Sequence, residues 1–110
     1  MCGEVRWTAT AAPSHSSVCH CRWCRKAAGA QSVAWLTFPR GSFSFVVGKP
    51  AEYRSSPPVI RTFCPRCGTS LTYTHDDRPG EIDVTTGSAD DPAAYPPKEQ
   101  VHEEDRLPWV

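Results

Sequence analysis

Hydrophobic and polar residues alternate over several short stretches of this chain, which is the pattern of half-buried β-strands. In residues 3–9, Val5 and Trp7 fall on one side of an extended chain and polar residues fall on the other. Residues 32–38 form an apolar run that is typical of a buried strand. The same reasoning predicts further short strands over residues 43–47, 51–54, 71–74 and 81–86.

Turn signals between these stretches predict how the chain is connected. Residues 48–50 (Gly-Lys-Pro) separate two predicted strands, 43–47 and 51–54, and make them a candidate β-hairpin. Residues 11–17 are small and polar, so we expect a loop there.

The remaining segments predict one short helix and a tail. Residues 22–28 are compatible with one or two helical turns that Gly29 ends. From residue 88 onward the chain is rich in Asp, Pro and Ala and has too few apolar residues for its own core. We expect this part to pack as an extended tail, anchored by Leu107 and Trp109. The chain is therefore mostly strands and loops, in one domain over residues 1–110.

The overall composition argues against several classes of partner. The 110 residues carry a formal net charge of zero, so no general field attracts nucleic acid or an anionic membrane. No run of about eighteen apolar residues could cross a membrane, and the first residues lack the hydrophobic segment of a signal peptide. We expect a soluble, cytoplasmic protein. Its six cysteines then favour metal binding, with disulfides in a secreted protein as the alternative.

Three of these cysteines lie close together in the sequence Cys19-His20-Cys21-Arg22-Trp23-Cys24. The spacing suits a tight loop that turns three thiolates toward one metal ion, and soft sulfur ligands favour zinc. Structural zinc sites normally have four protein ligands, whereas three ligands leave a position for water or substrate. A purely structural site, completed by His20 or Cys2, is the alternative.

A second metal signal is the zinc-knuckle pattern Cys64-Pro65-Arg66-Cys67-Gly68. Its two thiolates lie one tight turn apart. Pro65 fixes its backbone φ angle, and Gly68 permits a left-handed backbone.

The six cysteines can be divided between metal ions in two ways. One division is a single ribbon site made of Cys21, Cys24, Cys64 and Cys67. Its two pairs would be separated by far more than the roughly 15–20 residues of the compact pattern, and two cysteines would have no role. The other division is two sites, Cys19–Cys21–Cys24 and Cys2–Cys64–Cys67. We favour the second division because it uses every cysteine.

Four segments in this order carry a family resemblance: Cys2-Gly3-Glu4-Val5-Arg6, Cys19-His20-Cys21-x-x-Cys24-Arg25-Lys26, Ala34-Trp35 and Phe63-Cys64-x-x-Cys67-Gly68-Thr69. The chain resembles the glutathione-dependent formaldehyde-activating enzyme family, whose domain also occurs in a centromere protein. The resemblance covers nearly the whole chain. It implies an Mss4-like, mainly β fold of short antiparallel sheets tied together by two zinc sites.

The resemblance also implies roles for the cysteines. The catalytic zinc ligands of the family match Cys19, Cys21 and Cys24. Three of its four structural zinc ligands match Cys2, Cys64 and Cys67. The family usually opens with Cys-x-Cys-Gly, so one structural ligand has no counterpart here. Water, the terminal amine or another group would complete that site.

The reaction implied by the resemblance is that of a zinc-dependent carbon–sulfur lyase. Such an enzyme forms S-hydroxymethylglutathione from formaldehyde and glutathione, or acts on a related thiol adduct. A substrate thiol that enters a three-thiolate zinc site would lose its proton and become a nucleophile. Arg22, Arg25 and Lys26 lie beside the metal loop and are candidates for pairing with the carboxylates of glutathione.

The alternative function is a non-catalytic zinc module that binds protein or nucleic acid. Zero net charge and the lack of a long basic stripe argue against nucleic acid, and we expect no membrane partner. The three basic residues beside the metal loop could equally form a solvated surface. We expect Trp35 and Phe63 to lie in the core, and we assign no catalytic role to His75 or His102. The sequence does not predict an oligomeric state.

Overall fold

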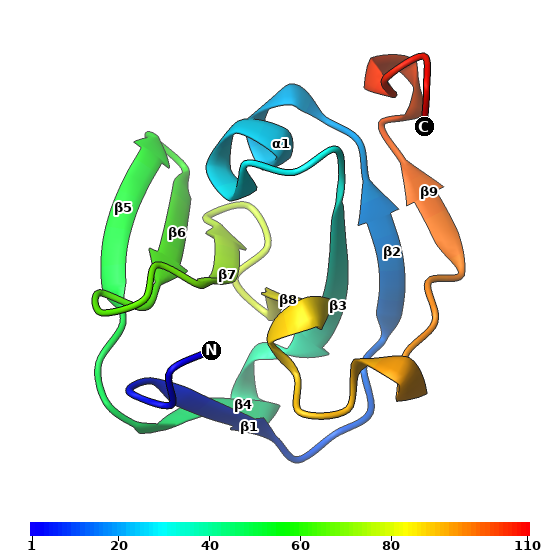
Figure 1. Ribbon diagram of the computed structural model, residues 1–110. Helices are drawn as coiled ribbons and strands as arrows, with labels where there is room; N and C mark the ends of the chain where they lie inside the picture. The colour runs from blue at the N-terminus through cyan, green and yellow to red at the C-terminus, as the bar shows by residue number, and fades with distance from the viewer.

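The computed structural model describes residues 1–110 and contains nine β-strands and one α-helix, α1 (Arg22–Ala28). The strands are β1 (Arg6–Ala9), β2 (His15–Cys19), β3 (Val33–Pro39), β4 (Phe43–Val47), β5 (Ala51–Ser56), β6 (Val59–Phe63), β7 (Ser70–His75), β8 (Glu81–Thr85) and β9 (Glu99–Val101). A small sheet pairs β1 with β4, and a large sheet has the order β5-β6-β7-β8-β3-β2-β9 (Figure 1). The prediction of a mainly β fold is confirmed.

The core lies where the small sheet packs against the middle of the large one. Leu36 and Val84 are cross-strand neighbours on β3 and β8, and both are fully buried. The Trp7 ring of β1 reaches across from the small sheet and lies 5.9 Å from the Phe38 ring and 5.6 Å from the Phe43 ring, centroid to centroid. Burial of each such side chain stabilises the fold by about 1.5–3 kcal/mol.

The predicted hairpin between residues 43–47 and 51–54 is wrong. β4 pairs with β1 and β5 pairs with β6, so the turn at Gly48 carries the chain from the small sheet to the large one. Gly48 has a φ of 71°, and a side chain there would collide with the carbonyl oxygen of Glu4. The turn residues predict a change of direction, but the pairing partner depends on long-range contacts.

The predicted loop over residues 11–17 is also wrong in part, because β2 begins at His15. Ser16 and Ser17 hide this strand from a hydrophobicity pattern, yet they pair antiparallel with β3. On its other side β2 pairs in parallel with β9, as Figure 1 shows. The C-terminal segment, expected to be an extended tail, therefore adds an edge strand to the large sheet.

Helix α1 forms over the predicted residues and ends where predicted. The Cys21 sulfur caps its first turn by accepting a hydrogen bond from the Cys24 backbone N–H, with a separation of 3.3 Å. Gly29 adopts the left-handed backbone, and its N–H donates to the Arg25 carbonyl oxygen at 2.8 Å. Cys24 is the one helix residue that is buried, so the helix serves to hold this thiol close to Cys21.

Predictions about individual apolar residues have mixed outcomes. Trp35 lies in the core as predicted, with 6% of its surface exposed. Phe63 is 37% exposed, so its predicted core position is wrong: the neighbouring Thr62 takes the inward side of β6. Leu107 is half-buried, whereas Trp109 is 71% exposed and does not anchor the tail. None of the helices combines the length and the apolar character needed to span a bilayer.

Candidate metal centres and cavity

The six cysteines gather into two groups of three, and all six are free thiols. Within each group the sulfur atoms lie within 4.8 Å of one another, and no His, Asp or Glu side chain joins either group. We call Cys19, Cys21 and Cys24 the loop group and Cys2, Cys64 and Cys67 the knuckle group. A single ribbon site that takes two cysteines from each group does not form.

The loop group is assembled by the end of a strand and the start of a helix. Cys19 is the last residue of β2, Cys21 caps α1, and Cys24 lies one turn further on. Between them, His20 is buried and points away from the sulfurs: its Nε2 lies 2.7 Å from the Gln100 Oε1, next to β9. This contact explains why the histidine in the middle of the motif is not part of the group.

The thiols of Cys19 and Cys24 have opposite pKa shifts, because they lie close enough to share a proton. Hydrogen bonding to Cys24, together with burial, raises the pKa of the Cys19 thiol. The same hydrogen bond with Cys19 lowers the pKa of Cys24 to about 5. Without a metal ion, Cys24 loses its proton more readily while Cys19 keeps its own. A thiophilic divalent ion supplies the charge that lets all three become thiolates, so the donor set fits zinc.

The knuckle group is built on a tight turn at the end of β6. The Gly68 N–H donates to the Cys64 carbonyl oxygen at 2.9 Å, and Gly68 has a φ of 80°. Cys2 reaches this turn from the N-terminus, with its sulfur 3.8 Å from the Cys64 sulfur. A hydrogen bond from the Thr69 hydroxyl lowers the pKa of Cys67 to about 5. Three soft donors around one turn fit a zinc ion that ties the N-terminus to β6 and β7.

The terminal amine, one candidate for completing the knuckle site, contacts an oxygen next to the knuckle group. It donates a hydrogen bond to the Thr69 hydroxyl oxygen over 3.3 Å. The amine therefore lies beside the knuckle group and is bonded to an oxygen there.

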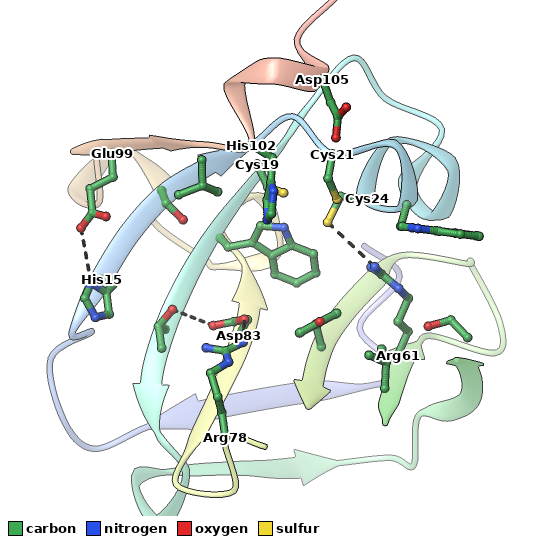
Figure 2. Close-up of a pocket in the computed structure, with 18 of the residues that line it drawn as sticks. His15, Cys19, Cys21, Cys24, Arg61, Arg78, Asp83, Glu99, His102 and Asp105 are labelled. Atoms are coloured by element: carbon green, nitrogen blue, oxygen red, sulfur yellow. Dashed lines mark hydrogen bonds and ion pairs between the residues drawn. The ribbon is translucent and has the colours of Figure 1, made fainter. Parts of the chain in front are cut away.

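A cavity of about 700 Å³ opens beside the loop group, and all three of its cysteines line the wall (Figure 2). No cysteine of the knuckle group lines this cavity. Trp35 and Tyr73 form an apolar part of the wall, and their rings meet edge to face at 6.1 Å. The two chemically similar groups thus differ in access: one faces a space large enough for a small ligand.

Arg61 of β6 brings a positive charge to the loop group. Its Nη2 lies 3.9 Å from the Cys24 sulfur, and its guanidinium lies 4.9 Å from the centroid of the Tyr73 ring. Figure 2 shows the guanidinium pointing toward the sulfur from the opposite side of the cavity. The positive charge helps to lower the pKa of Cys24, whereas burial raises the pKa of Tyr73.

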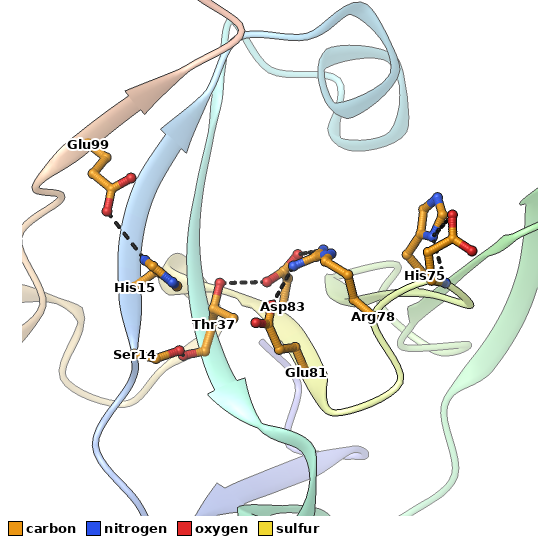
Figure 3. A network of polar contacts seen from close by, with 9 residues as sticks. Ser14, His15, Thr37, His75, Arg78, Glu81, Asp83 and Glu99 are labelled. Atoms are coloured by element: carbon orange, nitrogen blue, oxygen red, sulfur yellow. Dashed lines mark hydrogen bonds and ion pairs between the residues drawn. The ribbon is translucent and has the colours of Figure 1, made fainter.

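A polar network occupies the far side of the cavity (Figure 3). Asp83 accepts hydrogen bonds from the Thr37 hydroxyl at 2.6 Å and from the Arg78 Nη2 at 2.8 Å. The Asp83 carboxylate in turn raises the pKa of Arg78. Next to this pair, the His15 Nδ1 lies 3.3 Å from the Glu99 Oε1. Two carboxylates, Glu81 and Asp83, share the Arg78 guanidinium, so this side of the cavity offers no free cation to an anionic ligand.

The basic residues that follow the metal loop lie outside this cavity. They line a second, shallower hollow together with Gly29, Ala30, Gln31, Leu107 and Trp109. We call this the basic hollow; its cations are Arg22, Arg25 and Lys26. Side chains one or two positions from Cys24 on the helix project in other directions than Cys24, which explains why these residues do not line the cavity. The predicted role of these residues in substrate binding stays a prediction.

The sequence profile described as glutathione-dependent formaldehyde-activating enzyme matches residues 1–105. The chain belongs to this family. A crystal structure of a Rhodobacter sphaeroides protein is similar in fold, with a TM-score of 0.71 and 20% sequence identity over 91% of this chain and 94% of that chain. No curated protein matches the sequence.

In this member of the glutathione-dependent formaldehyde-activating enzyme family, sequence reasoning missed the cavity wall opposite the cysteines. Arg61 and Tyr73 lie on β6 and β7, and only the antiparallel pairing of these strands brings them to the loop group. His102, to which no role was assigned, also lines the cavity, whereas His75 does not. The one local signal was the position of Arg61 three residues before the knuckle, within a strand-like run.

Proposed function

We propose that the chain is a zinc-dependent carbon–sulfur lyase that forms S-hydroxymethylglutathione from formaldehyde and glutathione, or acts on a related thiol adduct. The observation that carries this proposal is the difference in access between the cysteine groups. Neither group has a fourth His, Cys, Asp or Glu ligand, but only the loop group lines the cavity of about 700 Å³, from which a ligand can reach the open position. Catalytic zinc sites have three protein ligands and an accessible position, whereas structural sites are closed.

In this proposal Cys19, Cys21 and Cys24 hold the catalytic zinc ion. A zinc ion bound there supplies the charge that keeps a substrate thiol deprotonated near neutral pH. Trp35 and Tyr73 give the adjoining wall an apolar surface that excludes water from the reacting sulfur. A carbon–sulfur bond forms between glutathione and the formaldehyde carbon, the carbonyl π electrons move to oxygen, and that oxygen takes up a proton. The reverse sequence breaks the same bond.

The knuckle group has a structural role in this proposal. Cys64 is buried and the group lies outside the cavity, so a zinc ion there would brace the N-terminus and the turn between β6 and β7. We also propose a cytoplasmic location, because six free thiols suit a reducing compartment.

A rate measurement on the zinc-loaded protein tests the proposed reaction. Formaldehyde and glutathione form the adduct without an enzyme, so NMR exchange spectroscopy should compare the exchange rate with and without protein. We expect the wild-type protein to accelerate exchange and a Cys24→Ser variant to lose most of that acceleration. Equal rates for the wild type, the variant and the protein-free solution would refute the proposal.

One observation favours the alternative of an interaction module. The basic hollow places three cations beside the exposed Trp109, and this combination suits an anionic partner. The module interpretation predicts that formaldehyde and glutathione exchange at the protein-free rate. It also predicts that mutation of the basic hollow, and not of the loop group, abolishes partner binding.

A further inference from the structure

Arg61 differs from the other basic side chains that line the cavity. Each of the others has a carboxylate partner within 4 Å: Arg78 with Glu81 and Asp83, His15 with Glu99, and His102 with Glu104. Arg61 has no carboxylate within that distance. It is half-buried, and its polar contact is with the sulfur of Cys24. Because no carboxylate shares this guanidinium, its N–H donors other than the one facing Cys24 are available to a ligand.

The guanidinium is held in place before any ligand arrives. Arg61 and Tyr73 are directly opposite each other on β6 and β7, so their side chains share one face of the sheet. The Tyr73 ring lies under the guanidinium at 4.9 Å, while the Cys24 sulfur fixes one of its nitrogens. These two contacts reduce the conformational entropy that binding would otherwise remove.

The direction of the guanidinium suits an anionic ligand. It carries five N–H donors in a planar fork that matches the geometry of a carboxylate. One nitrogen faces the Cys24 sulfur, and the side chain lines the same cavity as the loop group. A ligand whose sulfur sits at the loop group and whose carboxylate lies a few bonds away would therefore meet Arg61.

We propose that Arg61 binds the carboxylate of the thiol ligand and makes the site selective for thiols that carry one. This inference rests on the proposed function, because it requires a thiol at the loop group. It assigns the specificity to β6, within the cavity, and it gives the ligand class as mercaptocarboxylates, which includes glutathione. A competing role for Arg61 is to balance the charge of the cysteine sulfurs, without contact to the ligand.

A matched pair of ligands separates these two roles. The probes are 3-mercaptopropionate and its neutral amide, 3-mercaptopropionamide, titrated by calorimetry into the zinc-loaded full chain. The wild-type protein should bind the carboxylate more tightly than the amide by about 10- to 100-fold, which is the range for a charge-assisted hydrogen bond. In Arg61→Gln this preference should fall to within about twofold, while the affinity for the amide stays nearly unchanged.

Two further variants serve as controls for charge and for position. Arg61→Lys retains the charge but not the fork, and it should retain part of the preference. Arg25→Gln removes a cation from the basic hollow and should lower the preference by no more than about fivefold, because this residue does not line the cavity and solvent screens its charge. Zinc content and circular dichroism of each variant show whether the fold is maintained.

The possible results point to different conclusions. If Arg61→Gln weakens both thiols alike and the preference for the carboxylate survives, Arg61 acts on the sulfurs and the inference is wrong. If Arg25→Gln, and not Arg61→Gln, removes the preference, the carboxylate is bound from the basic hollow and the inference is again wrong. If neither thiol binds to the wild-type protein, the proposed function itself fails, and the inference fails with it.

Discussion

The loop group and the knuckle group each consist of three cysteines, but their surroundings differ. The knuckle cysteines sit around a tight turn whose backbone hydrogen bonds close it off, and they lie outside the cavity. The loop cysteines lie where β2 passes into α1, with a cavity on one side and the Arg61 guanidinium nearby. The cysteines alone predict that both groups can hold a metal ion, whereas access and nearby charge distinguish a site that a substrate could reach from one that it could not.

The largest effect on stability should come from the knuckle group. Cys64 is 3% exposed and joins the N-terminus to β6 and β7, so Cys64→Ala should remove zinc from this site and leave two unpaired thiolates. We expect the free energy of unfolding to fall by about 3 kcal/mol or more. Thermal melts followed by circular dichroism measure this. A melting temperature within a few degrees of the wild type would contradict a structural role for the knuckle.

The largest effect on ligand binding should come from the loop group. Cys24→Ala removes one of three zinc ligands that line the cavity, so glutathione affinity should fall by at least about 100-fold. The fold should survive better than in Cys64→Ala, because the loop is local to β2 and α1. Calorimetry and melts on both variants test the contrast. If both variants lose stability and glutathione affinity to the same extent, the loop group is not specific to ligand binding and the knuckle group is not specific to stability.

The two groups should release zinc to a chelator at different rates. Cys2 is exposed, whereas Cys19 and Cys24 of the loop group are buried, so we expect the knuckle site to release zinc first. A chromogenic chelator should record two phases of release. Cys2→Ser should abolish the fast phase and Cys24→Ser the slow one; a single shared phase would contradict the two-site description.

The smallest effect should come from the basic hollow. Arg22, Arg25 and Lys26 are predicted to attract the carboxylates of glutathione, but they lie outside the cavity, where solvent screens their charge. Replacing one of them with Gln should weaken glutathione binding by about 0.2–1 kcal/mol, and the loss should shrink as salt rises. Affinities at low and high ionic strength measure this. A loss well above about 1 kcal/mol at low salt would place the carboxylate site in the hollow.

Features encoded within a few residues could be predicted from the sequence. The loop group follows from the spacing of Cys19, Cys21 and Cys24, since ligands in one short loop necessarily lie close together. The end of α1 at Gly29 follows from the backbone freedom of glycine. The buried strand that contains Trp35 follows from its apolar run. Each of these predictions depends on local geometry alone.

Features that depend on strand pairing could not be predicted in the same way. β2 contains Ser16 and Ser17, which carry no hydrophobic signal, and it becomes a strand because β3 and β9 flank it. β4 and β5 lie on either side of a turn, but β4 pairs with β1 and β5 pairs with β6. Arg61 reaches the loop group only through the order of strands in the large sheet, to which no residue pattern near it points.

In the proposed function, a thiol ligand binds at the loop group through its sulfur. Calorimetric titration of the zinc-loaded protein with glutathione and with S-methylglutathione tests it most directly, because the two ligands differ only in whether the sulfur can become a thiolate. We expect S-methylation to weaken binding by about 100-fold or more, since a thioether is a far poorer zinc ligand than a thiolate. Equal affinity for the two ligands would contradict binding through sulfur at the loop group.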